Sequence, residues 1–481
     1  MNKTAKNTAI YFAGTVIMAL LGFANSMLLT HILDSQVYAM YGLFSTFTTA
    51  VITLISFGYD ASYTRFYYEH GMTQKKFMWT CVKYPLIVLG IFSIVLFEPS
   101  RSLLTLVFGE KLAYKTIIIM FFYILFSFVH RFSQLTARME ERAGNYILSN
   151  IVARSGFIIL LVVLFFLIKD ISFEAVLLSF AIGGLASILI NIFVIVKVFN
   201  AVPHISGRTT DRGLFRYGFP IMLNNVLVLL IPIVEKIIIR SLAGWEILGI
   251  FTATSIFQTV ALMILNTVDN IWNPIIYKNI DKPDKLKPMI HTWGLSLTVL
   301  LAIGIAFVIL LRRWLILLLN RAYYNANIIA PAIFLGGCIN FITVIYGVGV
   351  NIKKKSIHHL ISPIIQIIIS VGLSYLLIPR LGLIGIGISS LSSIVVSRGY
   401  RMILGIHYYN TGNSEWKSFI ILISSIIASV MSMFLTSLYW DIATSILLLV
   451  VTLLVANKDL IAIFKLFVSL FFNKKKKQEK N

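Results

Sequence analysis

Long apolar stretches separated by short polar segments recur along the whole chain. A helix that crosses the hydrocarbon core of a membrane, ~30 Å thick, needs roughly 20 mostly apolar residues at a rise of 1.5 Å per residue. Segments of this kind lie near residues 9–31, 37–59, 78–97, 116–134, 146–168, 174–196, 218–240, 247–274, 291–311, 327–349, 358–378, 382–405 and 418–439, with a shorter one near 441–456. The pattern predicts an all-α integral membrane protein with about 14 transmembrane helices.

Composition excludes a soluble protein. Hydrophobic residues make up 58% of the 481 positions, which would leave too little polar surface to face water. The loops are too short for a catalytic domain outside the membrane, which needs on the order of 50 residues. The chain also lacks the phosphate-binding pattern GxxxxGK[ST]. We therefore predict that the protein is not an enzyme, and that any transport uses an ion gradient, the membrane potential or the substrate gradient.

A net charge of +22 could indicate a nucleic-acid partner, but the positions of the charges argue against one, because they alternate between loops as in a membrane protein. Most of the 41 Lys and Arg residues lie in every second loop, on the same side as the N-terminus. Cytoplasmic loops of membrane proteins carry this excess of positive charge. We therefore predict a multi-pass protein of the cytoplasmic (inner) membrane with both termini in the cytoplasm.

Two stretches, beginning at Met40 and Leu248, share a pattern of Gly and Phe, a Thr/Ser-rich helix and a closing acid. If this similarity is more than shared membrane composition, it indicates two six-helix bundles with a site at their interface. The predicted organisation is a first bundle at 1–200, a second at 201–410, an added hairpin at 411–457 and a basic tail at 458–481. The tail is either an amphipathic helix on the anionic leaflet or a purely topogenic signal.

The seventh apolar segment carries a polar stripe. At 100° per residue Asn224 lies above Glu235, and Asn225 lies above Lys236. Pro232, within the same segment, is expected to bend the helix and free a backbone carbonyl. The stripe fits a cavity wall, with Glu235 as a possible ion-coupling group. The alternative is that Glu235 and Lys236 lie near the outer interface and neutralise their neighbours.

In the eighth segment Ser255, Asn266 and Asn273 share one face, which is too hydrophilic for lipid, and Gln258 lies on the same segment. We predict that this face contacts protein or water. Asp269, on the same segment, either exchanges a proton or binds a cation during transport, or is an acid at a helix end with no transport role.

Several basic residues lie deeper inside the apolar segments than is needed to set the orientation of the helices in the membrane. Buried Arg and Lys are costly in a membrane unless they face a cavity or a partner, and they suit phosphate or pyrophosphate. The predicted cationic cavity consists of Arg65, Lys83, Arg154, Lys236, Arg398 and Arg401, with Arg131 at an inward-facing vestibule. Each of them alone could instead extend its charged end to the membrane surface. The scattered His residues show no metal-ligand spacing, so no metal or cofactor is predicted.

Three short motifs in a fixed order carry a family resemblance. They are LDSQVYAMYG at 33–42, ASYTRF at 61–66, and EKIII at 235–239 followed by LGIF at 248–251. With them the chain resembles the polysaccharide transporter family, the Wzx-type flippases of lipid-linked oligosaccharides, in the superfamily that includes MATE exporters and lipid II flippases. The resemblance implies alternating access around a cationic central cavity.

The implied substrate is an undecaprenyl-pyrophosphate-linked oligosaccharide, such as an O-antigen, capsule or exopolysaccharide repeat unit. The implied partners are this substrate and membrane lipids, with a polysaccharide polymerase and a chain-length regulator as further candidates. The hairpin at 411–457 departs from twelve-helix members and is similar to fourteen-helix ones.

Two other functions remain open from the sequence. A MATE-like ion-coupled exporter of small organic cations would carry a dominant acidic site, whereas basic residues outnumber acids in these segments. A membrane-embedded glycan polymerase or ligase would need a large external loop with Arg or His, and the longest candidate, 98–115, is short.

Overall fold

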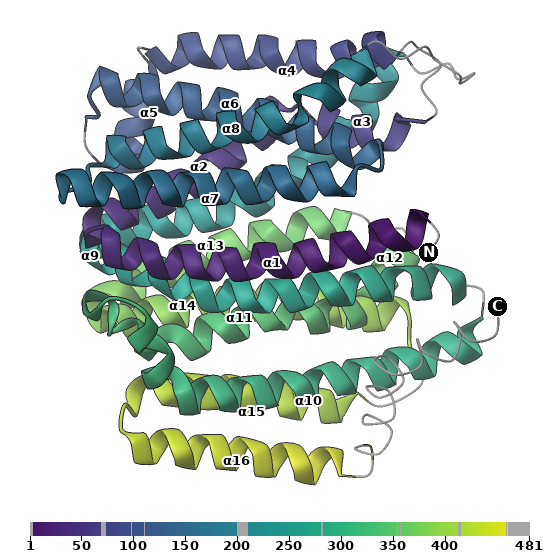
Figure 1. Cartoon of the computed structure of the whole chain (residues 1–481). Helices are drawn as coiled ribbons and strands as arrows, with labels where there is room; N and C mark the ends of the chain where they lie inside the picture. The colour runs from purple at the N-terminus through teal and green to yellow at the C-terminus, as the bar shows by residue number, and fades with distance from the viewer. Residues whose placement is uncertain are drawn as a thin grey trace. The chain divides into compact units, whose positions relative to one another are not determined.

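The predicted fold class is confirmed: in this all-α membrane protein the residues that its structure, a computed structural model, describes form helices joined by short turns, with no strand among them (Figure 1). Those residues are 3–68, 74–97, 99–109, 111–199, 210–279, 282–353, 355, 357–411, 415–457 and 459. Among them, ten helices are long and apolar enough to cross a membrane by length and composition. The other predicted segments fall on α1, α4 and the two parts of α9.

The chain divides into two compact units, Met1–Gly249 (unit 1) and Ile250–Asn481 (unit 2). The predicted lobe limits at 200 and 410 stay predictions. Unit 1 contains α1 (Lys3–Ile32), α2 (Ser35–Ile55), α3 (Tyr59–Phe66), α4 (Gln74–Phe97), α5 (Pro99–Phe108), α6 (Tyr114–Met139), α7 (Ala143–Ile168), α8 (Phe173–Phe199) and the first part of α9 (Asp211–Asn279).

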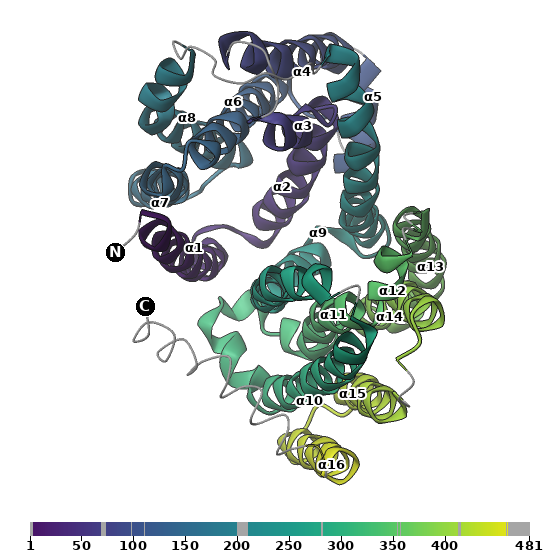
Figure 2. The ribbon, with the colours of Figure 1, turned by 90° about the vertical axis from the view of Figure 1, so that its right-hand side faces the viewer.

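Unit 2 contains the rest of α9 and the elements that follow it. These are α10 (Pro283–Leu315), the short 3-10 helices η1 (Ile316–Leu318) and η2 (Arg321–Tyr323), α11 (Ala326–Tyr346), α12 (Val348–Ile352), α13 (Ile357–Leu381), α14 (Leu383–Tyr408), α15 (Trp416–Phe434) and α16 (Leu438–Ala456). The predicted hairpin corresponds to α15 and α16, which pack on α10 (Figure 2). Apart from Asp459, the predicted amphipathic tail lies outside the described residues.

A single residue interrupts α9. Gly244 has φ 82° and ψ 179°, whereas the residues on both sides of it are helical. Glycine adopts this conformation without the steric cost that a Cβ would impose. The seventh and eighth predicted segments therefore lie on either side of Gly244.

The interior of unit 1 is dominated by aromatic and branched aliphatic side chains from α2, α3, α4 and α6. Tyr63 and Phe77 stack there with ring centroids 5.4 Å apart, and both are fully buried. The outward faces carry exposed apolar residues, such as Phe166 on α7. This arrangement is expected for helices surrounded by lipid.

A strained turn joins α2 to α3 and fixes where α9 begins. Phe57 and Gly58 both have positive φ, 50° and 77°. A Cβ on Gly58 would lie 2.1 Å from the carbonyl carbon of Gly218, so the two backbones touch. Ser62 Oγ donates a hydrogen bond of 2.6 Å to the carbonyl of Leu214. The turn therefore holds the first turns of α9 against α3.

We expect Gly58→Ala to lower the free energy of unfolding by about 1–3 kcal/mol, because a side chain at this position is strained by the positive φ and collides with the Gly218 backbone. The matched control is Gly90→Ala on α4, where nothing lies within 4 Å of the added Cβ. Thermal unfolding of the purified protein in detergent measures both variants. Equal melting temperatures for the two would contradict the expectation.

Candidate functional site

A cavity of about 370 Å³ lies within unit 1 among α2, α6 and α7. We call it the arginine pocket, after the two Arg residues in its lining. Its lining residues are Thr49, Ile52, Ser127, His130, Arg131, Gln134, Leu135, Arg138 and Tyr146. They come from the C-terminal parts of α2 and α6 and the start of α7. This is the end of unit 1 that the charge pattern predicts to be cytoplasmic.

One face of α6 supplies most of the polar lining. Ser127, Arg131, Gln134 and Arg138 follow one another at intervals of three or four residues, which places them on a single helical stripe. Gln134 is fixed by its neighbours: its Nε2 donates to Ser149 Oγ, and its Oε1 accepts 2.8 Å from the Asn150 amide. The pocket wall is therefore held by a hydrogen-bond network between α6 and α7.

The two arginines of the pocket differ in their partners. Arg131 forms an ion pair with Asp60 of α3. Arg138 is exposed, and its side chain has no hydrogen bond or ion pair with another described residue. The positive charge of Arg131 is thus largely offset, while that of Arg138 remains available to an anion.

His130 is oriented by a serine on α8. The Ser187 hydroxyl donates to the carbonyl of Gly184 at 2.6 Å, and His130 Nδ1 lies 2.8 Å from the same oxygen. Because that hydroxyl proton is engaged, Nδ1 is assigned as the donor to Ser187. The arginine pocket therefore combines a fixed imidazole, a free guanidinium and the Tyr146 ring, which suits a phosphorylated ligand.

Of the predicted cationic residues of unit 1, Arg131 lines the arginine pocket, whereas Arg65, Lys83, Arg154 and Lys236 occupy other places. Lys236 is buried, 8% exposed, and its Nζ donates to the Gly42 carbonyl at 2.7 Å and to Thr46 Oγ1 at 2.8 Å. Arg154 is exposed, and its Nη1 donates to the Met18 carbonyl at 3.0 Å.

The remaining predicted basic residues of unit 1 also have local contacts. Lys83 Nζ lies 3.5 Å from an Asp211 oxygen and 4.5 Å from the Tyr84 ring centroid. The exposed guanidinium of Arg65 lies 5.4 Å from the ring of Phe66.

The predicted polar wall is dispersed over both units. In unit 1, Asn224 and Glu235 are half-buried and Asn225 is exposed, and the buried Oδ1 of Asn224 has no hydrogen-bond partner among the described residues. In unit 2, three more predicted residues are half-buried, namely Gln258, Arg398 and Arg401. The side chains of Asn266 and Asp269 lie outside the described part of the chain.

Among the lining residues, the sequence pattern singles out Arg131 and gives no separate role to Arg138, His130, Gln134 or Tyr146. The sequence does contain a signal for this pocket, because the spacing of Arg131, Gln134 and Arg138 places them on one helical face. The partner of Arg131, Asp60, is distant in sequence and could not be identified from the pattern. Within the described residues, no group of three or more His, Cys, Asp or Glu side chains could hold a metal ion.

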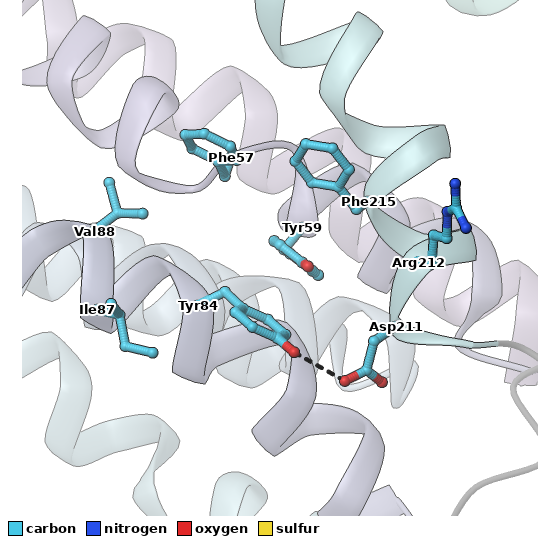
Figure 3. Close-up of a pocket in the computed structure, with 8 residues that line it drawn as sticks. All are labelled: Phe57, Tyr59, Tyr84, Ile87, Val88, Asp211, Arg212 and Phe215. Atoms are coloured by element: carbon cyan, nitrogen blue, oxygen red, sulfur yellow. Dashed lines mark hydrogen bonds between the residues drawn. The ribbon is translucent and has the colours of Figure 1, made fainter.

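A second cavity in unit 1, about 380 Å³, lies between the α2–α3 turn, α4 and the start of α9 (Figure 3). We call it the aromatic pocket. Four rings and two charged residues contribute to its lining, which consists of Phe57, Tyr59, Tyr84, Ile87, Val88, Asp211, Arg212 and Phe215. Figure 3 shows Tyr84 pointing to Asp211, and the Tyr84 hydroxyl donates to Asp211 Oδ2 at 3.1 Å.

Comparisons with known proteins match most of the chain. Residues 4–280 match the sequence model of a family described as polysaccharide biosynthesis protein. No curated protein sequence matches at a significant level. Among solved structures, a lipid II flippase MurJ in an inward closed conformation is similar, with a TM-score of 0.69 and 15% identity over 94% of this chain and 100% of that chain.

A second similar structure is the inward-facing conformation of a multidrug resistance MATE family transporter of the MOP superfamily. Its TM-score is 0.61 at 14% identity, and the match covers 84% of this chain and 98% of that one. At such identities the likeness establishes the fold alone.

Proposed function

The chain belongs to the polysaccharide biosynthesis protein family, and from this membership we propose that it is a flippase for an undecaprenyl-pyrophosphate-linked oligosaccharide. In this proposal it moves the lipid-linked repeat unit of an O-antigen, capsule or exopolysaccharide across the cytoplasmic membrane by alternating access. The arginine pocket is the observation that carries the proposal, because a pyrophosphate cannot enter an apolar bilayer without compensating charge.

The arginine pocket supplies that compensation in a defined way. The free guanidinium of Arg138 can donate two parallel hydrogen bonds to phosphate oxygens. Arg131 shares its hydrogen-bond donors between the ligand and Asp60. The Asp60 carboxylate also keeps the Arg131 guanidinium in place. Tyr146 adds a hydroxyl and a flat face. The pocket thus recognises the one chemical group that all substrates of this class share, whatever sugars they carry.

The basic residues predicted from the sequence extend this proposal. Arg154, Lys236, Arg398, Arg401, Arg65 and Lys83 would contact the head group along its path, while Asn224, Asn225, Gln258 and Asn266 would line that path. Glu235 and Asp269 would couple an ion to the cycle. No covalent step is needed, because the lipid tail stays in the bilayer while the head group crosses. Cytoplasmic termini and contacts with a polymerase and a chain-length regulator belong to the same proposal.

Transport in reconstituted vesicles tests the function. Vesicles containing the protein should move a fluorescent lipid-linked glycan between leaflets, as measured by accessibility of the label to an added membrane-impermeant quencher. Empty vesicles should show no movement on the same timescale. Equal movement of a fluorescent phospholipid would show a non-selective scramblase instead, and export of an organic cation without glycan movement would support the MATE-like alternative.

Replacing Arg154, Lys236 or Arg398 by Ala should slow translocation roughly tenfold, since a hydrogen bond to a charged group contributes ~1.5 kcal/mol or more. Lys236→Ala also removes two hydrogen bonds between α9 and α2, so its melting temperature is measured alongside. Unchanged flipping in all three variants at equal protein levels would refute the role of these residues in the path.

A further inference from the structure

The lining of the aromatic pocket changes from apolar to charged along its length. Figure 3 shows Ile87 and Val88 at one end and Asp211 and Arg212 at the other, with the rings between them. The volume of about 380 Å³ is near the lower limit for small-molecule sites, so the pocket holds a section of one chain rather than a whole lipid. A ligand that matches this lining is apolar along its length and charged at one end.

The middle of the pocket is walled by two stacked pairs of rings. Phe57 and Phe215 stack with centroids 5.7 Å apart at 23°, and Tyr59 and Tyr84 stack at 5.3 Å and 17°. Such rings give a large contact area and lose little side-chain entropy on binding, because each has only two rotatable angles. The walls therefore suit a narrow apolar group.

The α2–α3 turn that carries two of these rings is held by backbone contacts. Phe57 has a φ of 50°, which is costly for a residue with a bulky side chain. The contact of Gly58 with Gly218 and the Ser62–Leu214 hydrogen bond hold this turn against α9. The rings of the turn are therefore in position before any ligand arrives.

The apolar end of the pocket opens on a face of α4 that contacts lipid in a membrane. Ile87 is 56% exposed, and Ile91, one turn later, is 58% exposed. Trp79, two turns before Ile87, is 53% exposed, and such a ring is typical of the membrane–water interface. Ile87 thus lies about 12 Å deeper than Trp79 along the helix axis. Hydrocarbon can enter the pocket from the bilayer at this end.

The opposite end of the pocket has a net positive charge. Asp211 accepts from Tyr84 and pairs with Lys83 at 3.5 Å, so its carboxylate is already compensated. Arg212 is exposed, and its side chain has no hydrogen bond or ion pair with another described residue. One available guanidinium matches the single negative charge of a phosphodiester, whereas a pyrophosphate brings at least two charges.

We infer that the aromatic pocket binds one acyl chain of an anionic phospholipid whose phosphodiester lies at Arg212. This inference goes beyond the proposed function and does not depend on it. The charge pattern predicts that the start of α9 is cytoplasmic, and the cytoplasmic leaflet is the one that carries anionic phospholipids. The bound chain would contact the α2–α3 turn, α4 and the start of α9 together, since all three contribute to the lining.

Photo-crosslinking of the full-length protein in detergent tests the site. The probe is phosphatidylglycerol with a diazirine on one acyl chain, and labelled peptides are mapped by mass spectrometry. We expect labels on the α2–α3 turn, α4 and the start of α9. Labels spread evenly over the exposed helix faces would overturn the inference, because they would show only the lipid that surrounds any membrane protein.

Competition with unlabelled compounds identifies the ligand. Phosphatidylglycerol should compete at least fivefold better than phosphatidylcholine, since one basic residue near the surface contributes ~1 kcal/mol toward an anionic lipid. Glycerol 3-phosphate, which has no acyl chain, should not compete. Equal competition by phosphatidylcholine would overturn the anionic specificity, competition by glycerol 3-phosphate would indicate a site for free phosphate, and stronger competition by polyprenyl pyrophosphate would assign the pocket to a substrate chain.

A matched pair of arginine variants tests the charged end. Arg212→Gln removes the guanidinium of the lining, and Arg216→Gln removes the same charge one turn later on α9, at an exposed position outside the lining. We expect pocket labelling to fall at least tenfold in Arg212→Gln, because a hydrogen bond to a charged group is lost, and no more than about twofold in Arg216→Gln. Equal losses in the two variants would show only diffuse attraction and would overturn the inference.

A second pair of variants tests the apolar end. Ile87→Trp fills the pocket from its exposed rim, and Ile91→Trp adds the same bulk at an equally exposed position outside the lining. We expect at least a tenfold loss of pocket labelling in Ile87→Trp and none in Ile91→Trp. Both variants should melt at the wild-type temperature in lipid-free detergent, because both side chains face lipid. Unchanged pocket labelling in Ile87→Trp would overturn the inference.

Discussion

Replacing Asp441 by Asn is expected to lower the free energy of unfolding by about 3–5 kcal/mol, because it leaves the buried charge of Arg312 uncompensated. Both side chains are 0% exposed, and Arg312 Nη2 lies 2.6 Å from Asp441 Oδ1. Arg313 Nε also donates to Asp441, to Oδ2 at 3.1 Å. One carboxylate therefore serves two guanidinium groups of α10.

The other donors of Arg312 reach the backbone of unit 2. Its Nη1 donates to the Ser432 carbonyl at 2.6 Å, and its Nη2 lies 3.3 Å from the Leu435 carbonyl. The guanidinium thus joins α10 to the end of α15 and the start of α16. Loss of its counter-ion should loosen the hairpin at 411–457 from α10 before the rest of unit 2 unfolds.

The matched control for this prediction is Asp459→Asn. Asp459 pairs with Lys417 at 2.7 Å but is 30% exposed, and pairs near the surface contribute at most about 1 kcal/mol. Thermal unfolding in detergent compares the two variants. The double variant Arg312→Met, Asp441→Leu should recover most of the loss, because it removes both charges together. A loss in Asp441→Asn no larger than in Asp459→Asn would contradict the prediction.

Replacing Arg138 by Gln should weaken binding of a short-chain polyprenyl pyrophosphate by roughly 10- to 100-fold, since hydrogen bonds to charged groups contribute ~1.5–3 kcal/mol. Stability should not change, because the Arg138 side chain is exposed and makes no hydrogen bond or ion pair with a described residue. Translocation at low substrate concentration should fall by a similar factor, whereas a saturating concentration should partly restore it.

Arg380→Gln provides the matched control for Arg138. Arg380 is exposed near the end of α13, does not line the arginine pocket, and its replacement removes the same charge. The affinity of each purified variant for the pyrophosphate is measured by titration, with the shift in melting temperature as the signal of binding. Equal affinities of Arg138→Gln and Arg380→Gln would show that only net charge matters and would remove the arginine pocket from the proposal.

The helices could be predicted from the sequence because a span is a local property. About 20 apolar residues in succession suffice to indicate it, and the predicted segments fall on helices throughout, including both parts of α9. The break at Gly244 lies in the short interval between two predicted segments. The fold class therefore follows from a pattern that needs no knowledge of contacts.

The candidate site could be predicted only in part, because it depends on pairings between distant segments. The sequence indicates that Lys236 lies inside a span, but not that its ammonium donates to Gly42 and Thr46. Arg138 resembles any other charge at a helix end until its lack of a partner is known. Arg312 lies at the end of an apolar segment, where a snorkelling side chain is the ordinary expectation, and only its pairing with Asp441 shows that it is fully buried.

The break at Gly244 has a mechanical consequence. Because the two units are contiguous in sequence, the peptide bond from Gly249 to Ile250 is their sole covalent connection. Residues 245–249 are helical and torsionally stiff. The junction glycine, Gly249, is packed against Ser35, whereas nothing lies within 4 Å of a Cβ added at Gly244. Gly244 also has a positive φ, which glycine adopts without the steric cost of a Cβ. Gly244 is therefore the less constrained of the two glycines next to the junction, and a change in backbone direction would cost least there.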